Sequence, residues 1–267
     1  MIDNDSRRGD LLPLDPIMPG ASFLALLESR GLAPSWAAAP GGSEIEVPEA
    51  TTVLALRFDS GVVMAGDRRA TAGNVIAHRR MRKVFPADEY SAVAISGTAG
   101  MAAELTRLFQ TELEHYEKIE GTRLSLEGKA NYLARMVRGN LPMAFQGLVV
   151  VPLFCGFDEN DQVGRLYTFD VVGGRYEEQD YAATGSGGAE AKAFIKGVYE
   201  PGVNEERALE IAVEALVAAA EEDAATGGPD LRRGIYPNVV VVDTRGLTEV
   251  DEDHVAAVAT RVIGGRP

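Results

Sequence analysis

The stretch Ala50-Thr51-Thr52-Val53-Leu54-Ala55-Leu56 decides how the rest of this 267-residue chain is interpreted. If the peptide bond between Ala50 and Thr51 were cut, Thr51 would become an N-terminal residue with both a hydroxyl and a free α-amino group. Such an amine has a reference pKa of about 7.7–8.0, so part of it is unprotonated near neutral pH and can take the hydroxyl proton. Thr51 would then carry a nucleophile together with its own base.

Two charged residues follow this stretch at equal spacing, Asp67 at 16 residues from Thr51 and Lys83 at 16 residues from Asp67. Each borders an apolar run that is typical of a strand, Val62–Ala65 or Met81–Phe85, so both could lie side by side beneath the first strand. A lysine held charged by Asp67 would lower the pKa of the Thr51 amine and favour the threonine alkoxide. The alternative is an ordinary β-hairpin, in which Asp67 and Lys83 form a surface ion pair.

Several motifs in one order carry a resemblance to a known family. The run TTVLALRFDSGVVMAGDRRATAGNVI begins at Thr51, and the later motifs are Lys83, Ile95-Ser96-Gly97, Thr184-Gly185-Ser186-Gly187 and Asp223-Ala224-Ala225-Thr226-Gly227-Gly228. Together they resemble the mature β-subunit of the 20S proteasome, most of all its actinobacterial form, across roughly residues 51–245. The family usually has glycine before its N-terminal threonine, where this chain has Ala50.

The resemblance implies an N-terminal nucleophile hydrolase, a threonine endopeptidase that acts as the catalytic β-subunit of a 20S core particle and degrades unfolded proteins. Residues 1–50 would be a propeptide that the precursor removes by self-cleavage at Ala50-Thr51, and residues 51–267 would be the hydrolase domain. The implied partners are other β-subunits, α-subunits in stacked and seven-membered rings, an ATPase regulator acting through the α rings, and unfolded protein substrates. No cofactor or metal is implied.

The same resemblance assigns roles to individual residues. The implied catalytic set is Thr51, Asp67, Lys83, Ser186, Asp223 and Thr226, in which Ser186 supports the amine or its water. The Gly97 N–H would donate to the oxyanion. The substrate strand would be bordered by Ala70, Thr71, Gly97 and Ala99, and the first pocket shaped by Ala70, Met81, Phe85, Ile95, Ala99 and Ala103. Thr52 receives no role, and its replacement by alanine is expected to spare cleavage and activity.

Two rival functions remain open. A catalytically silent structural subunit of the same ring would keep the fold without the site, but Thr51, Asp67 and Lys83 together favour the enzyme. The second rival is the smaller, two-layered bacterial relative of the proteasome. That relative has little propeptide, so the 50 residues before Thr51 argue against it.

Composition bounds the classes of function further. With 46% hydrophobic and 25% charged residues the chain is typical of a globular protein. Its net charge of −14 argues against a nucleic-acid partner, because phosphate contacts need clustered Lys and Arg. The one basic cluster, Arg68-Arg69 with Arg79-Arg80-Arg82-Lys83, is interpreted as a solvated strand face or an interface. The single cysteine, Cys155, is expected to be a buried apolar residue.

Membrane and secretory classes are also disfavoured by the sequence. No stretch approaches the roughly 20 apolar residues that span a bilayer, and the acidic N-terminus does not resemble a signal peptide. The cytoplasm is therefore the expected compartment. Residues 1–50 contain six prolines and eight acidic against three basic side chains, a composition that predicts a weakly ordered segment.

The order of the predicted elements indicates an α/β (α+β) fold. Strands are expected at 51–58, 62–67 and 91–95, followed by a helix whose apolar face carries Met101, Leu105, Leu108, Phe109, Leu113 and Tyr116. Gly121 should end this helix, and Ser125 should cap a second one. The second half repeats the order, with strands at 148–157, 165–170 and 175–183, helices at 189–198 and 205–220, and a last strand at 238–243. This repetition predicts a four-layer αββα sandwich of two antiparallel sheets flanked by helices. The 254–263 segment could be a strand or a helix.

Other chemistries find little support. The position two residues before Ser186 is Thr184 rather than glycine, so this turn is not a nucleophile elbow, and it lacks the lysine of a phosphate loop. The histidines His78, His115 and His254 show no metal-ligand spacing and are expected at the surface.

Overall fold

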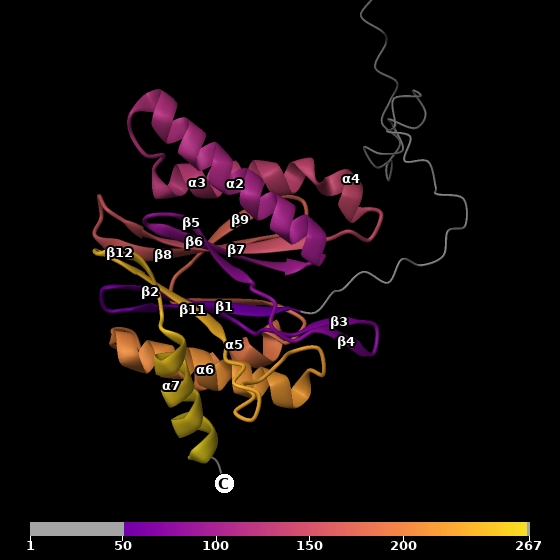
Figure 1. Ribbon diagram of the computed structural model, residues 1–267. Coiled ribbons are helices and arrows are strands. Elements are labelled where there is room, and N and C mark those ends of the chain that lie inside the picture. Colours follow the sequence, from indigo (N-terminus) through magenta and orange to yellow (C-terminus); the bar gives the residue numbers. More distant parts are fainter. Residues whose placement is uncertain (1–50, 266–267) are drawn as a thin grey trace, which may run out of the picture. The chain divides into compact units, whose positions relative to one another are not determined.

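The computed structural model describes residues 51–265, and it contains two five-stranded antiparallel sheets in this range. Figure 1 shows the sheets stacked face to face, with helices covering the outer side of each. The predicted four-layer αββα sandwich is therefore confirmed. The assigned propeptide, residues 1–50, lies outside the described residues, as do residues 266–267.

The first sheet has the strand order β10-β1-β2-β11-β12. Its strands are β1 (Thr52–Phe58), β2 (Gly61–Gly66), β10 (Tyr181–Gly185), β11 (Asn238–Asp243) and β12 (Gly246–Glu249). Because β1 lies between β10 and β2, Thr52 pairs with Gly185 on one side, while Val53 pairs with Gly66 on the other. The start of β1 is thus enclosed by the ends of two neighbouring strands.

The second sheet has the order β5-β6-β7-β8-β9. Its strands are β5 (Val84–Asp88), β6 (Ser91–Gly97), β7 (Val150–Asp158), β8 (Val163–Phe169) and β9 (Arg175–Glu178). Between the two sheets in sequence, β3 (Ala70–Ala72) and β4 (Val75–His78) form a separate hairpin, which projects beside β1 in Figure 1.

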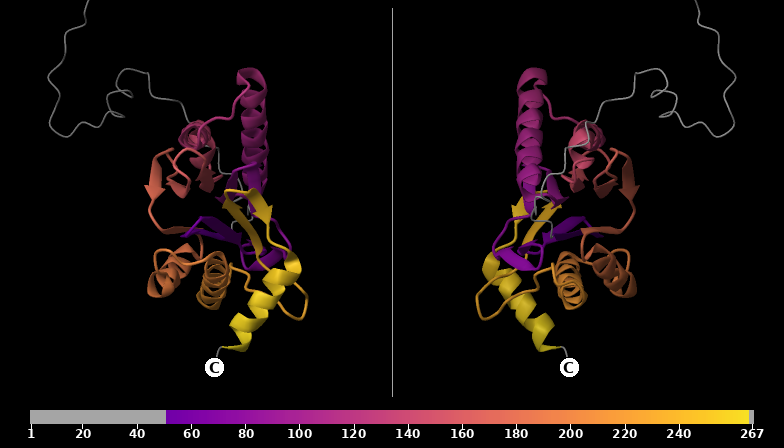
Figure 2. Two further views of the ribbon diagram at one scale, coloured as in Figure 1. Left: turned by 90° about the vertical axis from the view of Figure 1, so that its left-hand side faces the viewer. Right: turned by 90° about the vertical axis from the view of Figure 1, so that its right-hand side faces the viewer.

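Helices form the two outer layers. The second sheet is covered by α2 (Ala99–Glu120), α3 (Leu126–Gly139) and the short α4 (Leu141–Ala144). The first sheet is covered by α5 (Gly188–Val198), α6 (Glu205–Glu222) and α7 (Glu252–Gly264). In the side views of Figure 2, α2 runs upright beside its sheet while α5 and α6 are seen end-on.

Each strand alternates its side chains between two apolar layers, as the pleat of a sheet requires. Leu54 and Leu56 of β1 pack with α5 and α6, whereas Val53 and Ala55 point into the layer between the sheets. Cys155 is buried in that middle layer, as predicted. A third apolar cluster, centred on Phe109 of α2, joins the helices to the second sheet.

The predicted helix boundaries around residues 121–125 are confirmed. Gly121 ends α2 in the left-handed conformation at φ 67°, and its N–H donates to the Glu117 carbonyl. The Ser125 hydroxyl accepts the Gly128 N–H at 3.1 Å and so caps α3. The α2 apolar face is shifted from the prediction, because Leu108 and Tyr116 are exposed.

Three further sequence expectations need correction. The single strand expected at 175–183 is two strands, β9 and β10, which belong to different sheets. Strand β12 follows the strand that was expected to be the last, and the undecided 254–263 segment is the helix α7. The Met81–Phe85 run is only partly a strand, since β5 begins at Val84.

No helix in residues 51–265 combines the length and apolar character needed to cross a bilayer.

Candidate active site

Asp67 and Lys83 form a buried ion pair beneath the start of β1. Asp67 follows the last residue of β2 and Lys83 precedes the first residue of β5, so the two side chains come from the two different sheets. The Lys83 ammonium contacts Asp67 Oδ1 and also donates to the Arg69 carbonyl at 2.5 Å. Their side chains are 0% and 2% exposed, so the surface ion pair that the sequence left open is wrong.

The Asp67 carboxylate is fixed by the backbone around it. Its Oδ1 accepts the Thr52 N–H at 2.9 Å, while its Oδ2 accepts the N–H groups of Arg69 at 2.8 Å and Gly227 at 2.9 Å. One oxygen therefore receives both the Lys83 ammonium and the amide that follows Thr51. This shared acceptor places the lysine charge at the beginning of β1.

Burial lowers the pKa of Lys83, and the contact with Asp67 acts in the opposite direction. The charge of the lysine thus depends on its carboxylate partner, because removal from water disfavours an ammonium ion. A charged lysine that is held in such a pair changes the pKa of an amine that lies close to it.

A second polar group, formed by Ser186, Asp223 and Thr226, lies next to Thr52. Asp223 Oδ2 accepts from the hydroxyls of Ser186 and Thr226, each at 2.5 Å. Burial acts to raise the pKa of Asp223, but these hydrogen bonds outweigh it and the pKa is lowered. Asp223 is therefore an ionised acceptor that orients two hydroxyls.

Thr52 joins this group, which the sequence did not predict. Its hydroxyl accepts the Gly187 N–H at 2.9 Å and shares a hydrogen bond of 2.5 Å with the Thr226 hydroxyl. The side chain is fully buried. The only signal in the sequence was its place beside Thr51, because the partners Gly187 and Thr226 lie more than 130 residues away.

The turn after β10 touches the backbone of Thr51 directly. The Ser186 N–H donates to the Thr51 carbonyl at 3.0 Å. Gly185 has φ 97°, and a Cβ built on it would lie 1.6 Å from the Thr51 carbonyl oxygen. Only glycine allows this approach. The close contact with Thr51 therefore explains the glycine in this turn, and no phosphate loop or nucleophile elbow is needed to explain it.

Gly97 ends β6 and leads into α2. It has φ 105°, and a Cβ there would lie 2.1 Å from the Val149 carbonyl oxygen, so a side chain is excluded. Ala99 is the first residue of α2. The N-terminal end of a 22-residue helix favours negative charge, which suits this corner to a developing oxyanion.

The residues assigned to substrate binding lie on neighbouring elements. Ala70 and Thr71 belong to β3, and the Met81 N–H donates to the carbonyl of Arg68, next to Asp67. Phe85 and Ile95 both pack against the apolar cluster beneath α2. Ala99 and Ala103 stand in the first two turns of that helix, where Ala103 is exposed.

Comparison with known proteins decides the family. The family described as "Proteasome subunit" matches residues 47–230, more than half of the chain. The chain belongs to the proteasome subunit family. A protein named proteasome subunit beta from Acidimicrobium ferrooxidans is 53% identical over 244 residues, which cover 91% of this chain and 89% of that protein.

Two further proteins with the same name support the assignment. The one from Acidothermus cellulolyticus is 53% identical over 249 residues, covering 91% of this chain and 86% of its own length. The one from Streptomyces griseus is 48% identical over 269 residues, covering 99% and 96% respectively. The similarity to β-type proteasome subunits therefore extends over nearly the whole chain, and it makes the chain a peptidase-type hydrolase that assembles with other proteasome subunits.

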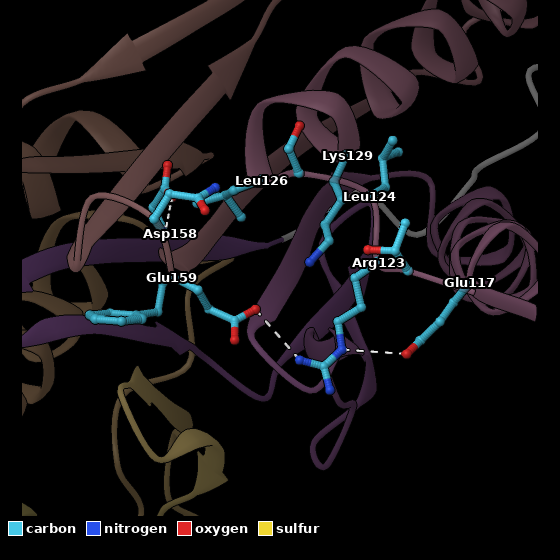
Figure 3. Close-up of a pocket in the computed structure, with 11 residues that line it drawn as sticks. Glu117, Arg123, Leu124, Leu126, Lys129, Asp158 and Glu159 are labelled. Carbon is cyan, nitrogen blue, oxygen red and sulfur yellow. Dashed lines mark hydrogen bonds and ion pairs between the residues drawn. The ribbon is translucent and has the colours of Figure 1, made fainter. Parts of the chain in front are cut away.

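A polar cavity of this proteasome subunit lies away from Thr51. It measures about 420 Å³ and is found where the turn after α2 meets α3. Figure 3 shows Arg123 reaching between Glu117 and Glu159 there, with the buried Lys129 behind it. Because α2 is 22 residues or about 33 Å long, this cavity and Gly97 stand at opposite ends of the helix.

In the part of the chain that the structure describes, no group of three or more His, Cys, Asp and Glu side chains is arranged to hold a metal ion. His78, His115 and His254 are all exposed.

Proposed function

We propose that this chain is the catalytic β-subunit of a 20S proteasome and that it works as a threonine endopeptidase on unfolded proteins. The observation that carries the proposal is the buried Lys83–Asp67 pair, whose carboxylate also binds the amide that follows Thr51. A fully buried charge pair is costly unless it is well bonded, and it adds little stability that an apolar pair would not add. Its contact with the amide that follows Thr51 supports a chemical role for the pair.

In the precursor, the proposed first reaction is self-cleavage at Ala50-Thr51. The Thr51 nitrogen is then an amide and cannot act as a base, so surrounding groups must take the hydroxyl proton. The Thr51 oxygen attacks the Ala50 carbonyl, the C–N bond breaks, and an ester remains with a free Thr51 amine. Water hydrolyses this ester and releases residues 1–50 with a new carboxyl end.

In the mature subunit, the Thr51 amine would act as the base for its own hydroxyl. The hydroxyl oxygen attacks the substrate carbonyl, the amine takes the hydroxyl proton and passes it to the leaving amine, and water then hydrolyses the ester. The nearby Lys83 charge disfavours protonation of the amine and so keeps it available. Ser186, Asp223 and Thr226 would hold the amine or its water.

The proposed oxyanion donor is the Gly97 N–H, at the corner before α2. Deletion of one such donor in other enzymes costs about 2.7–4 kcal/mol of transition-state stabilisation. The substrate would run as an extended strand between Ala70 and Thr71 on one side and Ala99 on the other. Met81, Phe85, Ile95 and Ala103 would shape its first pocket together with the two alanines.

We place this activity in the cytoplasm, inside stacked β and α rings of seven subunits each, which an ATPase regulator supplies through the α rings. An enclosed chamber would restrict access to this active site. A freely accessible threonine peptidase would cut any unfolded chain.

An intact mass of the purified protein tests the proposal. Loss of residues 1–50 from assembled particles, together with hydrolysis of a fluorogenic peptide, is the expected result. An assembled particle that keeps the full-length mass would instead favour the catalytically silent subunit.

A further inference from the structure

A basic groove lies next to the β3–β4 hairpin, on a chain whose net charge is −14. It measures about 610 Å³ and is lined by Ala77, His78, Arg79, Arg80, Met81, Arg233 and Ile235. Ile235 is buried and Met81 partly buried, so apolar surface lies beside exposed arginines. A groove of this kind fits a segment that is both acidic and apolar.

The arginines of this groove are incompletely neutralised. Arg79 and Arg80 form no ion pair with any carboxylate in residues 51–265, although Arg80 donates to the Arg233 carbonyl at 2.8 Å. The acidic groups nearby are Glu249, which pairs with Arg82, Asp230, which pairs with Arg233, and Glu252, which faces Arg68.

Arg68 lies at the inner side of the same basic surface, where it donates to the Arg80 carbonyl at 3.2 Å. Burial lowers the pKa of Arg68, and the like charges of Arg80 and Arg82 lower it further, whereas Glu252 acts in the opposite direction. Its buried Nε has no acceptor among the described residues. A carboxylate brought into the groove would relieve this repulsion.

The groove is close to Thr51 along the hydrogen-bonded backbone. The Asp67 N–H donates to the Thr52 carbonyl at 3.1 Å, and the Met81 N–H donates to the carbonyl of Arg68 at 2.9 Å. Two backbone contacts thus connect the start of β1 to a wall of the groove. The start of β1, to which the preceding residues are covalently joined, therefore lies close to this surface.

That preceding chain reads Glu44-Ile45-Glu46-Val47-Pro48-Glu49. Acidic and apolar residues alternate from Glu44 to Val47, so an extended conformation would present Glu44 and Glu46 on one side and Ile45 with Val47 on the other. Glu46 stands five residues before Thr51, and five extended residues reach at most roughly 17 Å. The segment has the charge, the apolar content and the length to reach the groove.

We propose that residues Glu44–Glu49 occupy the basic groove in the uncut chain, with their carboxylates on Arg79 and Arg80 and their apolar side chains on Met81 and Ile235. Covalent attachment makes the contact intramolecular, so it forms at a high effective concentration even if it is weak. This docking goes beyond the proposed function, since it concerns the chain before any cut and needs no catalysis.

Disulfide trapping tests the docking in the full-length chain. The variant Glu46→Cys/His78→Cys is prepared with Thr51→Ala, which keeps the segment attached whether or not the wild type cleaves itself. The native Cys155 is fully buried, and burial raises the pKa of its thiol, so it contributes little background. The matched control is Glu46→Cys/Glu177→Cys, because the exposed Glu177 lies on β9, at the sheet edge opposite β5.

The expected result is an intrachain disulfide that forms at least about tenfold faster in the His78 pair than in the Glu177 pair, measured by non-reducing electrophoresis and peptide mass. Equal rates would overturn the proposal. Links that form only between chains, at a rate rising with protein concentration, would also overturn it and assign the groove to a second copy.

Charge reversal gives an independent test in the same background. Arg79→Glu/Arg80→Glu should slow trapping about tenfold, and adding Glu44→Lys should restore part of the rate, because the pairing is then reversed on both sides. In the trapping variant that keeps Arg79 and Arg80, salt of about 0.5 M should slow disulfide formation, since exposed charges are screened. Failure of the double reversal to restore trapping would contradict an electrostatic contact.

Discussion

Replacement of Lys83 should affect both the peptidase activity and the stability of the fold. Lys83→Ala leaves Asp67 buried without its cation, which costs about 3–5 kcal/mol in comparable pairs. Peptidase activity should fall at least about 100-fold in Lys83→Ala, and in Lys83→Arg as well, because arginine keeps the charge but changes its reach and geometry. A fluorogenic peptide assay with a thermal melt measures both effects.

The control for Lys83 is the double variant Lys83→Met/Asp67→Asn. It removes both charges and should recover part of the lost stability while remaining inactive, because asparagine keeps only one of the two oxygens that accept backbone N–H groups. Wild-type turnover by any of these variants would remove Lys83 from the proposed mechanism.

Thr52 is the residue whose importance only the structure reveals. Thr52→Val keeps the shape but leaves the buried Gly187 N–H without its acceptor, which should cost about 1–3 kcal/mol. The variant should still be cut before Thr51, but its peptidase activity should fall several-fold because the Thr226 hydroxyl loses a partner.

Thr106→Val is the matched control for Thr52. Its hydroxyl is also buried and donates to the Ala102 carbonyl at 2.8 Å, but it lies within α2. It should leave activity unchanged. Equal losses of activity in the two valine variants would show that Thr52 acts only through stability.

The sequence predicted the contact between Asp67 and Lys83 but not the hydrogen bonds of Thr52. Two equal spacings in the chain indicated that Asp67 and Lys83 could meet, and they do, because each borders a strand. The link from Thr52 to Thr226 could not be predicted from spacing, since it depends on how the turn after β10 sits against β1. Burial of the ion pair likewise follows from the stacking of two sheets.

At the scale of elements, the cap of α3 gives a simple test of the local structure. Ser125→Ala removes the hydroxyl that accepts the Gly128 N–H, and such caps are worth about 1 kcal/mol. For a domain of this size the melting temperature should fall by about 2–4 °C, with activity unchanged. Ser60→Ala is the control, since Ser60 is exposed and bonds only to its neighbour Asp59. A shift as large in Ser60→Ala would contradict the capping role.

Elements with a clear hydrophobic period, or with a residue that marks where a helix ends, were predicted well. Strands that are defined by their pairing in the folded chain were not. The apolar face of α2 and the glycine that ends it are local signals. The division of residues 175–185 into β9 and β10 is not local, because it depends on the chain crossing from one sheet to the other between Glu178 and Tyr181. Strand β12 was missed for a similar reason, as it is short and half exposed.

At the scale of the whole molecule, cleavage before Thr51 should wait for assembly. An active site on a free subunit would cut unfolded chains at random, so we expect the isolated precursor to keep its full mass. Addition of an α-type partner should produce large particles and loss of residues 1–50, as gel filtration with mass spectrometry would show. Complete processing of isolated monomers would contradict this order of events.

The most direct test of Thr51 as the nucleophile compares Thr51→Ala with Thr51→Ser in assembled particles. Thr51→Ala should keep residues 1–50 and show no peptidase activity, because the same hydroxyl is needed in both reactions. Thr51→Ser should be processed and active but slower, since serine lacks the methyl group that restricts χ1. The intact mass measures loss of residues 1–50, and a fluorogenic peptide assay measures the peptidase activity. A Thr51→Ala chain that is still cut to begin at residue 51, with no active neighbour present, or that still hydrolyses the peptide, would show that the nucleophile lies elsewhere.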